Sequence, residues 1–188
     1  MTMQLPESPE LVLSPQLGRG EKLLWSGRPR QGIFLRSNDA YLIPFSLLWG
    51  GFAIFWEHGV LTSNAPFFFG IWGIPFVLIG LYLIVGRFFV DAKQRSRTFY
   101  GLTNQRVIIV SGVVSRNIKS LQLRTLSEVS LAEREDGSGT ITFGPSAPWW
   151  SGVGGWPGAR KDASPTFESI PAAREVLERI RSAQNEAS

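Results

Sequence analysis

The chain of 188 residues contains no cysteine, and its single histidine is His58. Without cysteine the chain cannot carry a disulfide framework, a thiolate nucleophile or a thiolate metal site. The lone histidine has no second histidine or cysteine with which to complete a metal site or a pair of nucleophile and base. We therefore expect a protein that is not an enzyme and that binds no cofactor and no metal.

Lys and Arg are missing from the whole of residues 41–86, where the only acid is Glu57 and the only histidine is His58. Two apolar stretches, Tyr41–Trp56 and Ala65–Gly86, fill most of this region. At about 1.5 Å of helical rise per residue, the second stretch reaches about 33 Å, which suffices to cross a hydrocarbon core of about 30 Å. The sequence predicts a transmembrane hairpin with helices at about 40–61 and 65–87. The first stretch is shorter and must extend past Glu57, so a tilted or shallow arm is the alternative.

Cations flank this hairpin on both sides, whereas its loop, residues 57–64, carries none. The positive-inside bias then predicts a multi-pass protein of the inner (plasma) membrane with both termini in the cytoplasm. Residues 1–39 form a polar N-terminal segment without the features of a removable signal peptide. Glycines in both helices fit close packing within the hairpin, or dimerisation; they are Gly50, Gly51, Gly70, Gly73 and Gly80.

After Thr98 the pattern becomes that of short strands. Val107–Val110 is a β-branched run that follows the turn-like Thr103-Asn104-Gln105, and residues 113–123 continue as an extended segment. An acidic turn at residues 133–139 precedes another short strand, residues 140–143. A helix is predicted from Pro171 to about Ala183, with apolar side chains on one face, namely Ala173, Val176, Leu177 and Ile180. These elements predict an antiparallel sheet capped by a C-terminal helix.

The sequence resembles those of bacterial membrane proteins with a pleckstrin-homology-like (PH-like) domain. The resemblance is carried by residues 20–29 (GEKLLWSGRP), by residues 100–109 (YGLTNQRVII), by residues 137–144 and by residues 167–174. It implies an α+β membrane protein, in which a two-helix transmembrane hairpin at 40–87 precedes a PH-like antiparallel β-barrel or sandwich capped by a C-terminal helix. The PH-like domain would occupy residues 95–184, with a Trp- and Gly-rich loop at 144–165 and a tail at 185–188. This fold hosts lipid binding, peptide binding and assembly alike.

Charge is unevenly divided within the predicted soluble part. Between Arg87 and Arg124 eight cations face the single acid Asp91, whereas the region after Thr125 has more acids than bases. Basic residues near an anionic leaflet contribute about 1 kcal/mol each, so we predict a face that contacts anionic phospholipid. Its residues would be Arg95, Arg97, Arg106, Arg116, Lys119 and Arg124. For residues 93–97 the alternative is that the positive-inside signal alone accounts for the charges.

Tryptophans provide further candidate contacts. Trp149, Trp150 and Trp156 could enter the membrane interface, cover the sheet as a lid or anchor a partner protein. Trp25 could be an interface anchor or a core residue of an extra strand at residues 22–26. The predicted function is a membrane-anchored binding or scaffold module that faces the cytoplasm. The alternative is a subunit that binds a protein partner or its own copies without lipid specificity, and no nucleic acid is expected because no nucleic-acid motif accompanies the basic charge.

Overall fold

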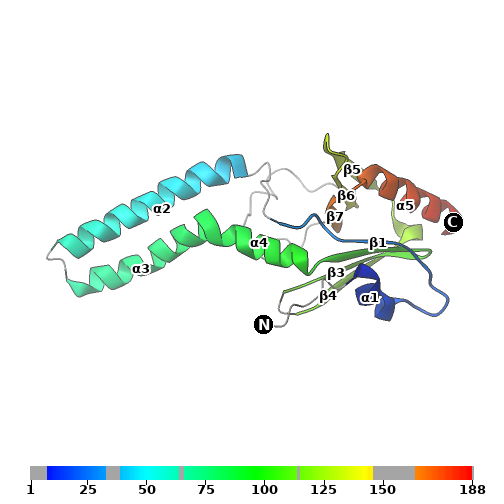
Figure 1. Ribbon diagram of the computed structural model, residues 1–188, viewed down its shortest axis with the longest axis horizontal. Coiled ribbons are helices and arrows are strands. Elements are labelled where there is room, and N and C mark those ends of the chain that lie inside the picture. Colours follow the sequence, from blue (N-terminus) through cyan, green and yellow to red (C-terminus); the bar gives the residue numbers. More distant parts are fainter. Residues whose placement is uncertain (1–7, 33–38, 64–65, 114, 146–163, 188) are drawn as a thin grey trace. The chain divides into compact units, whose positions relative to one another are not determined.

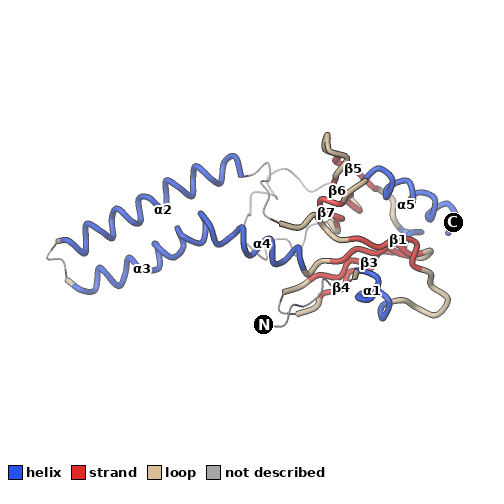
Figure 2. The backbone as a smooth tube through the Cα atoms, in the orientation of Figure 1, coloured by secondary structure: helices blue, strands red, loops and turns tan. Residues whose placement is uncertain are grey.

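The structure is a computed structural model, and it describes residues 8–32, 39–63, 66–113, 115–145 and 164–187. The chain divides into two units. The first unit combines residues 1–32 with residues 93–151 and 161–188, and the second contains residues 33–92 and 152–160. Figure 1 shows the helices and strands with their labels, and Figure 2 shows the same elements coloured by type.

Two antiparallel sheets build the first unit. The four-stranded sheet has the order β1 (Leu23–Gly27), β2 (Phe99–Thr103), β3 (Arg106–Ser111), β4 (Asn117–Gln122). The three-stranded sheet has the order β5 (Val129–Glu133), β6 (Gly139–Phe143), β7 (Thr166–Ile170). The expected antiparallel strands are confirmed, but in the described residues the two sheets have separate hydrogen-bond ladders and form no closed barrel. Trp25 lies in β1, so the extra strand near residues 22–26 exists.

Helix α5 (Ala173–Ala187) packs on the main core of the first unit. The core is formed by inward side chains of both sheets together with Ala173, Val176, Leu177 and Ile180 of α5, which confirms the apolar face predicted for this helix. Aromatic rings dominate its centre. The Phe167 ring stacks on Tyr100 with centroids 4.6 Å apart and meets Phe143 edge-on at 5.0 Å. Burial of these large rings supplies much of the hydrophobic stabilisation of the unit.

The other face of the four-stranded sheet is covered by the N-terminal segment. The short helix α1 (Pro9–Leu13) and the 3₁₀ turn η1 (Ser14–Gln16) precede β1. Val12 and Leu13 form a second core with side chains of β2 and β3, namely Phe99, Ile108 and Val110. Strand β2 is consequently buried along its entire length. The residues before the hairpin are therefore part of the same folded unit as the strands that follow it.

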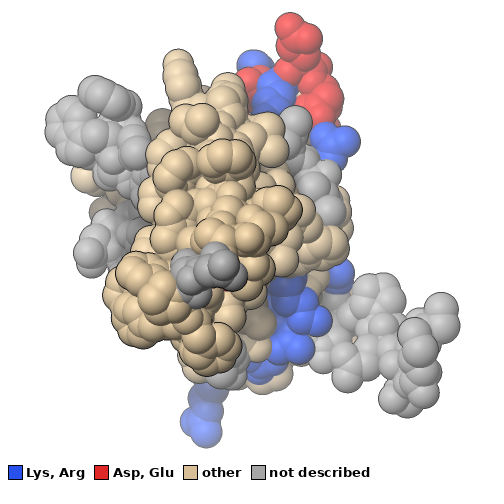
Figure 3. All heavy atoms as spheres, turned by 90° about the vertical axis from the view of Figure 1, so that its left-hand side faces the viewer, with Lys and Arg blue, Asp and Glu red and all other residues tan. Residues whose placement is uncertain are grey.

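The second unit is a helical hairpin. Helix α2 (Asp39–Thr62) is followed by α3 (Phe67–Leu81), which continues through a π-helical turn, η2 (Tyr82–Gly86), into α4 (Arg87–Ser96). Both helices are long and apolar enough to cross a membrane by length and composition, with 24 residues in the first and 30 in the second. They touch through glycine, since a Cβ atom on Gly80 would come within 2.9 Å of the Gly50 Cα atom. The face drawn in Figure 3 has a broad area without charged side chains.

Candidate functional site

Along the sequence, the hairpin lies between β1 and β2, which are neighbouring strands of the four-stranded sheet. Strand β1 ends at Gly27, which pairs with Tyr100, the second residue of β2. The β3–β4 turn lies at the same end of the sheet, because Phe99 pairs with Val110 and Ser111 pairs with Asn117. We call this end of the four-stranded sheet the entry end, defined by Gly27, Phe99, Ser111 and Asn117. Both covalent connections to the hairpin therefore leave the first unit at the entry end.

Two of the predicted lipid-binding cations lie at the entry end on exposed side chains. Arg97 precedes β2, and its Nη1 atom donates a hydrogen bond to the carbonyl oxygen of Val113 at 2.7 Å. Arg116 precedes β4 from the other side of the β3–β4 turn. Between and beside them, Val113 is 36% exposed and Ile118 is 43% exposed. The turn and the start of β4 thus expose apolar side chains at the end of the sheet where these cations lie, a combination suited to the boundary between head groups and acyl chains.

Arg95, in contrast, is buried. Its residue is only 3% exposed, and its Nη2 atom donates a hydrogen bond of 2.5 Å to the carbonyl oxygen of Gly32. Its own carbonyl oxygen accepts a hydrogen bond from Gln31 Nε2 at 3.4 Å. Arg95 therefore ties α4 to the segment that follows β1, and its guanidinium is not displayed on the surface with Arg97 and Arg116.

Arg106 lies at the opposite end of the same sheet and is paired with Glu21. Its Nε and Nη2 atoms each donate to one carboxylate oxygen of Glu21 at 2.8 Å, and Nη2 also donates to the carbonyl oxygen of Gln16 at 2.9 Å. The hydrogen bond from Arg106 is the main reason that the pKa of Glu21 is lowered to about 2, and the pKa of Arg106 is raised for the same reason. The positive charge of Arg106 is thus largely balanced by the Glu21 carboxylate within the fold.

The rest of the Leu-Thr-Asn-Gln-Arg hairpin serves the same contact. Thr103 Oγ1 donates to Glu21 at 2.7 Å and accepts the backbone N–H of Arg106 at 2.9 Å. Asn104 exchanges two hydrogen bonds with the backbone of Lys22, through its own N–H and through its Oδ1 atom. This motif therefore fastens the N-terminal segment to the β2–β3 turn. Sequence reasoning missed Glu21, which stands 85 residues from Arg106 in the chain.

The remaining predicted residues do not join the entry end. Lys119 lies within β4 opposite Ile109, half-buried on the face of the sheet that bears the main core. Arg124 lies in a 3₁₀ turn, η3 (Leu123–Thr125), where its Nε atom donates to the carbonyl oxygen of Ala187. Trp149, Trp150 and Trp156 lie outside the described residues. The structure thus places Arg97 and Arg116 on the surface at one end of the sheet, whereas Arg95 is buried and Arg106, Lys119 and Arg124 lie elsewhere.

The acidic turn after β5 is occupied by ion pairs. Arg174 Nη2 lies 2.5 Å from Glu133 Oε2, and Arg30 Nη1 lies 2.7 Å from Asp136 Oδ2. Hydrogen bonds from Ser138 lower the pKa of Asp136, with a smaller contribution from Arg30. Within the described ranges no group of three His, Cys, Asp or Glu residues is placed to hold a metal ion.

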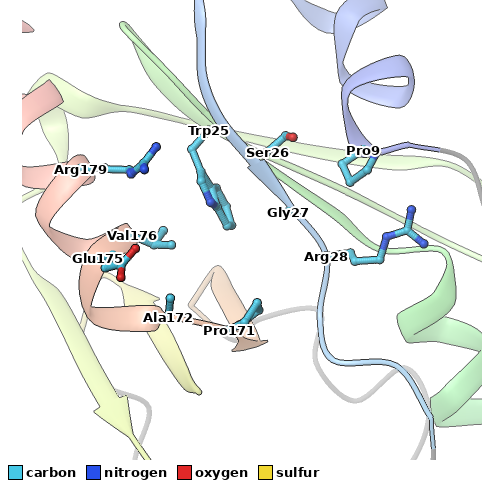
Figure 4. A pocket seen from close by; sticks show the side chains of 10 residues that line it. All are labelled: Pro9, Trp25, Ser26, Gly27, Arg28, Pro171, Ala172, Glu175, Val176 and Arg179. Atoms are coloured by element: carbon cyan, nitrogen blue, oxygen red, sulfur yellow. The ribbon is translucent and has the colours of Figure 1, made fainter. Parts of the chain in front are cut away.

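A pocket of about 350 Å³ opens between β1 and the start of α5. Figure 4 shows the Trp25 side chain pointing from β1 toward Pro171, Ala172 and Val176. The indole also contacts the core through Phe167, with ring centroids 5.6 Å apart. Arg179 and Glu175 supply opposite charges on the helix side, so the pocket combines one aromatic wall with a mixed polar rim.

Comparison with known proteins gives one result for the whole chain. The family model described as "Bacterial PH domain" matches residues 47–184, which include most of the hairpin, every strand from β2 to β7 and most of α5. Neither a curated protein nor a solved structure matches the chain.

Proposed function

Because the chain belongs to the bacterial PH domain family, we propose that it is a membrane-anchored binding or scaffold module and not an enzyme. The hairpin of α2 and α3 spans the inner membrane. The first unit, which we now call the PH-like unit, lies on the cytoplasmic side together with both termini. Arg97 and Arg116 hold anionic phospholipid at the entry end. The observation that carries this proposal is that both connections to the apolar hairpin leave the PH-like unit where these two cations lie.

The lengths and charges of the hairpin support the anchoring. Its helices meet the length and composition required to cross a bilayer. The side chains that cover them are mostly large, apolar and exposed, including Phe52, Phe55, Phe68 and Trp72. Such a surface is costly in water and favourable in lipid. The cations at residues 93–97, in contrast with the loop at residues 57–64, which has no Lys or Arg, favour the cytoplasmic orientation.

The lipid contact follows from connectivity and charge. Only Arg97 and Thr98 separate α4 from β2, so a spanning hairpin keeps the entry end close to the membrane surface. Each exposed cation near an anionic leaflet contributes about 1 kcal/mol, and the contribution falls off within about 10 Å at moderate salt. The exposed side chain of Val113 adds an apolar contact between the two cations. Arg95 and Arg106 act in folding under this proposal, and Lys119 and Arg124 are not part of the contact.

Vesicle flotation tests the lipid contact. Because the PH-like unit includes the N-terminal segment, the soluble variant joins residues 1–32 to residues 93–188 through a short Gly-Ser linker. We expect salt-sensitive flotation with vesicles that contain phosphatidylglycerol and little with phosphatidylcholine alone. Arg97→Gln/Arg116→Gln should lose the binding, whereas the control Arg179→Gln/Arg181→Gln, with the same change in charge on α5, should keep it. Equal loss in both variants would contradict a contact at the entry end.

A protein-binding role is the second candidate, and the pocket beside Trp25 favours it. An aromatic side chain in a partly enclosed groove next to an edge strand is a common anchor for a peptide. Chemical crosslinking in intact membranes would test this role by recovering a partner or a second copy. Loss of that crosslink in Trp25→Ser, with flotation unchanged, would support a protein-binding pocket that is separate from the lipid contact.

A further inference from the structure

Strand β1 lies at the edge of its sheet. Among the described strands it pairs only with β2, and β7 is likewise an edge strand of the other sheet. The two edges meet where the backbone N–H of Arg30, three residues past the end of β1, donates to the carbonyl oxygen of Ser169 in β7 at 2.8 Å. An edge strand directs the N–H and C=O groups of alternate residues away from its partner. Strand β1 therefore has a side on which another extended chain can pair.

The pocket of about 350 Å³ lies next to β1. One wall consists of residues 25–28, and the other consists of the turn before α5 and the first residues of that helix. The Trp25 indole lies along the strand, since a Cβ atom on Gly27 would come within 2.5 Å of its ring. Figure 4 shows Pro171 and Val176 across the pocket from this ring. Ligand pockets begin at about 300 Å³, so the space suffices for one large apolar side chain.

The turn in the opposite wall has an unusual backbone. Ser169 and Ala172 have φ angles of 47° and 48°, and among the described residues no other non-glycine residue has a positive φ. They flank Pro171, and both Pro171 and Ala172 are exposed and line the pocket. Residues with a Cβ atom rarely adopt this conformation, and such strained residues cluster at sites that hold ligands. The fold thus holds Pro171 and Ala172 in place opposite Trp25.

The charge of the pocket favours an acidic ligand. Its lining contains two arginines, Arg28 and Arg179, and one acid, Glu175. Arg179 is exposed on α5 and makes no ion pair with another described residue, whereas Arg174 on the same helix pairs with Glu133. A cation beside an apolar wall is complementary to a carboxylate that neighbours an apolar side chain.

We propose that the β1–α5 groove binds an extended segment of a partner protein, which pairs with β1 as an added strand. The groove is defined by Trp25, Gly27, Pro171, Val176 and Arg179. The bound segment places a large apolar side chain against Trp25 and an acidic side chain near Arg179. Main-chain hydrogen bonds to β1 supply affinity, and the pocket supplies specificity. This site rests on the protein-binding candidate named above and does not depend on the lipid contact at the entry end.

A random peptide library displayed on phage tests the groove. It is selected against the full chain in nanodiscs, with empty nanodiscs as the reference. We expect the enriched peptides to carry a large apolar residue and an acidic residue two positions apart, because alternate residues of a strand face the same side. No enrichment over empty nanodiscs, or enrichment without this pattern, would overturn the proposal.

Methylation of single backbone nitrogens in a selected peptide tests strand addition. Fluorescence anisotropy measures the Kd of each methylated peptide for the full chain. Methyl groups at every second position should weaken binding about tenfold or more, and those at the intervening positions should have little effect, because only alternate N–H groups face β1. Equal effects at all positions would overturn strand addition.

Variants of the chain locate the peptide. Arg179→Glu should weaken binding of the selected peptide about tenfold or more, whereas Arg181→Glu, the same exchange on α5 outside the pocket, should not. Equal binding to both variants would overturn the site. Arg97→Gln/Arg116→Gln should keep peptide binding, so the lipid contact and the groove fail separately. Crosslinked dimers of the full chain that the selected peptide displaces would assign the groove to a second copy and overturn a separate partner.

Discussion

Glu21 and Arg106 form a two-point ion pair that closes the N-terminal segment onto the β2–β3 turn, with both N–O distances at 2.8 Å. The Glu21 side chain is almost completely buried and that of Arg106 is about one quarter exposed. The pair therefore holds together two parts of the PH-like unit that are separated in sequence by the whole hairpin.

Loss of either partner should destabilise the PH-like unit. We expect Glu21→Gln and Arg106→Gln each to lower the free energy of unfolding by about 2 kcal/mol, because each leaves a buried charged or polar group without its partner. Urea unfolding of the soluble, hairpin-deleted variant, which joins residues 1–32 to residues 93–188, measures this free energy. Arg174→Gln, which breaks the exposed pair with Glu133, is the control and should have a much smaller effect. Additive effects of Glu21→Gln and Arg106→Gln in the double variant would contradict a direct interaction.

Acid should remove the same stabilisation. The pKa of Glu21 falls from 4.5 to about 2 on folding, so its contribution is fully present above about pH 4.5 and is lost as the pH drops toward 2. At about 1.36 kcal/mol per pKa unit the contribution is about 3 kcal/mol at most. Urea unfolding at several pH values should show the difference between the natural chain and Glu21→Gln shrinking over this window. A difference that stays constant down to pH 2 would contradict the assignment.

Helix α1 provides a test of the second core. Leu13 is fully buried against the sheet, whereas Leu11 in the same short helix is mostly exposed. We expect Leu13→Ala to cost about 3 kcal/mol of unfolding free energy, since it leaves a cavity, and Leu11→Ala to cost little. Thermal unfolding of the hairpin-deleted variant compares the two. Similar melting temperatures for both variants would show that α1 is not docked on the sheet.

Glycines in the hairpin distinguish packing within one chain from dimerisation. A Cβ atom on Gly80 would collide with the Gly50 backbone, whereas a Cβ atom on Gly51 would meet nothing within 4 Å. Gly80→Val should therefore lower the thermal stability of the full chain in detergent, and Gly51→Val should not. Loss of an oligomer on size exclusion only in Gly51→Val would instead support a dimer through the outer face.

Local patterns in the sequence were sufficient to predict much of the fold. The β-branched run at Val107–Val110 corresponds to β3, and the apolar spacing of Val176, Leu177 and Ile180 corresponds to the buried face of α5. Helix α1 was not predicted, because five residues carry no helical period and their order comes from docking on the sheet. Of the predicted barrel or sandwich, the closed barrel was wrong, because the described strands form two sheets with separate hydrogen-bond ladders. Strand patterns in a sequence do not reveal whether two sheets share a ladder.

Site prediction was limited by long-range pairing. The basic composition of residues 87–124 is a property of the sequence, but which cations are displayed depends on their partners. Arg106 donates hydrogen bonds to the Glu21 carboxylate, and Arg95 donates one to the carbonyl oxygen of Gly32. Arg97 and Arg116, in contrast, are exposed on the surface. The ion pair of Asp39 and Arg87 joins residues 48 positions apart, and no local pattern marks it.

The depth of Val113 in a bilayer is the most direct test of the central proposal. Because the chain has no cysteine, Val113→Cys in the full chain carries a single environment-sensitive fluorophore without background. Ser182→Cys, exposed near the end of α5, is the control. In vesicles that contain phosphatidylglycerol, we predict a blue-shifted emission at position 113 that lipid-attached quenchers reduce, and an aqueous emission at position 182. An aqueous, unquenched signal at both positions would contradict a lipid-facing entry end.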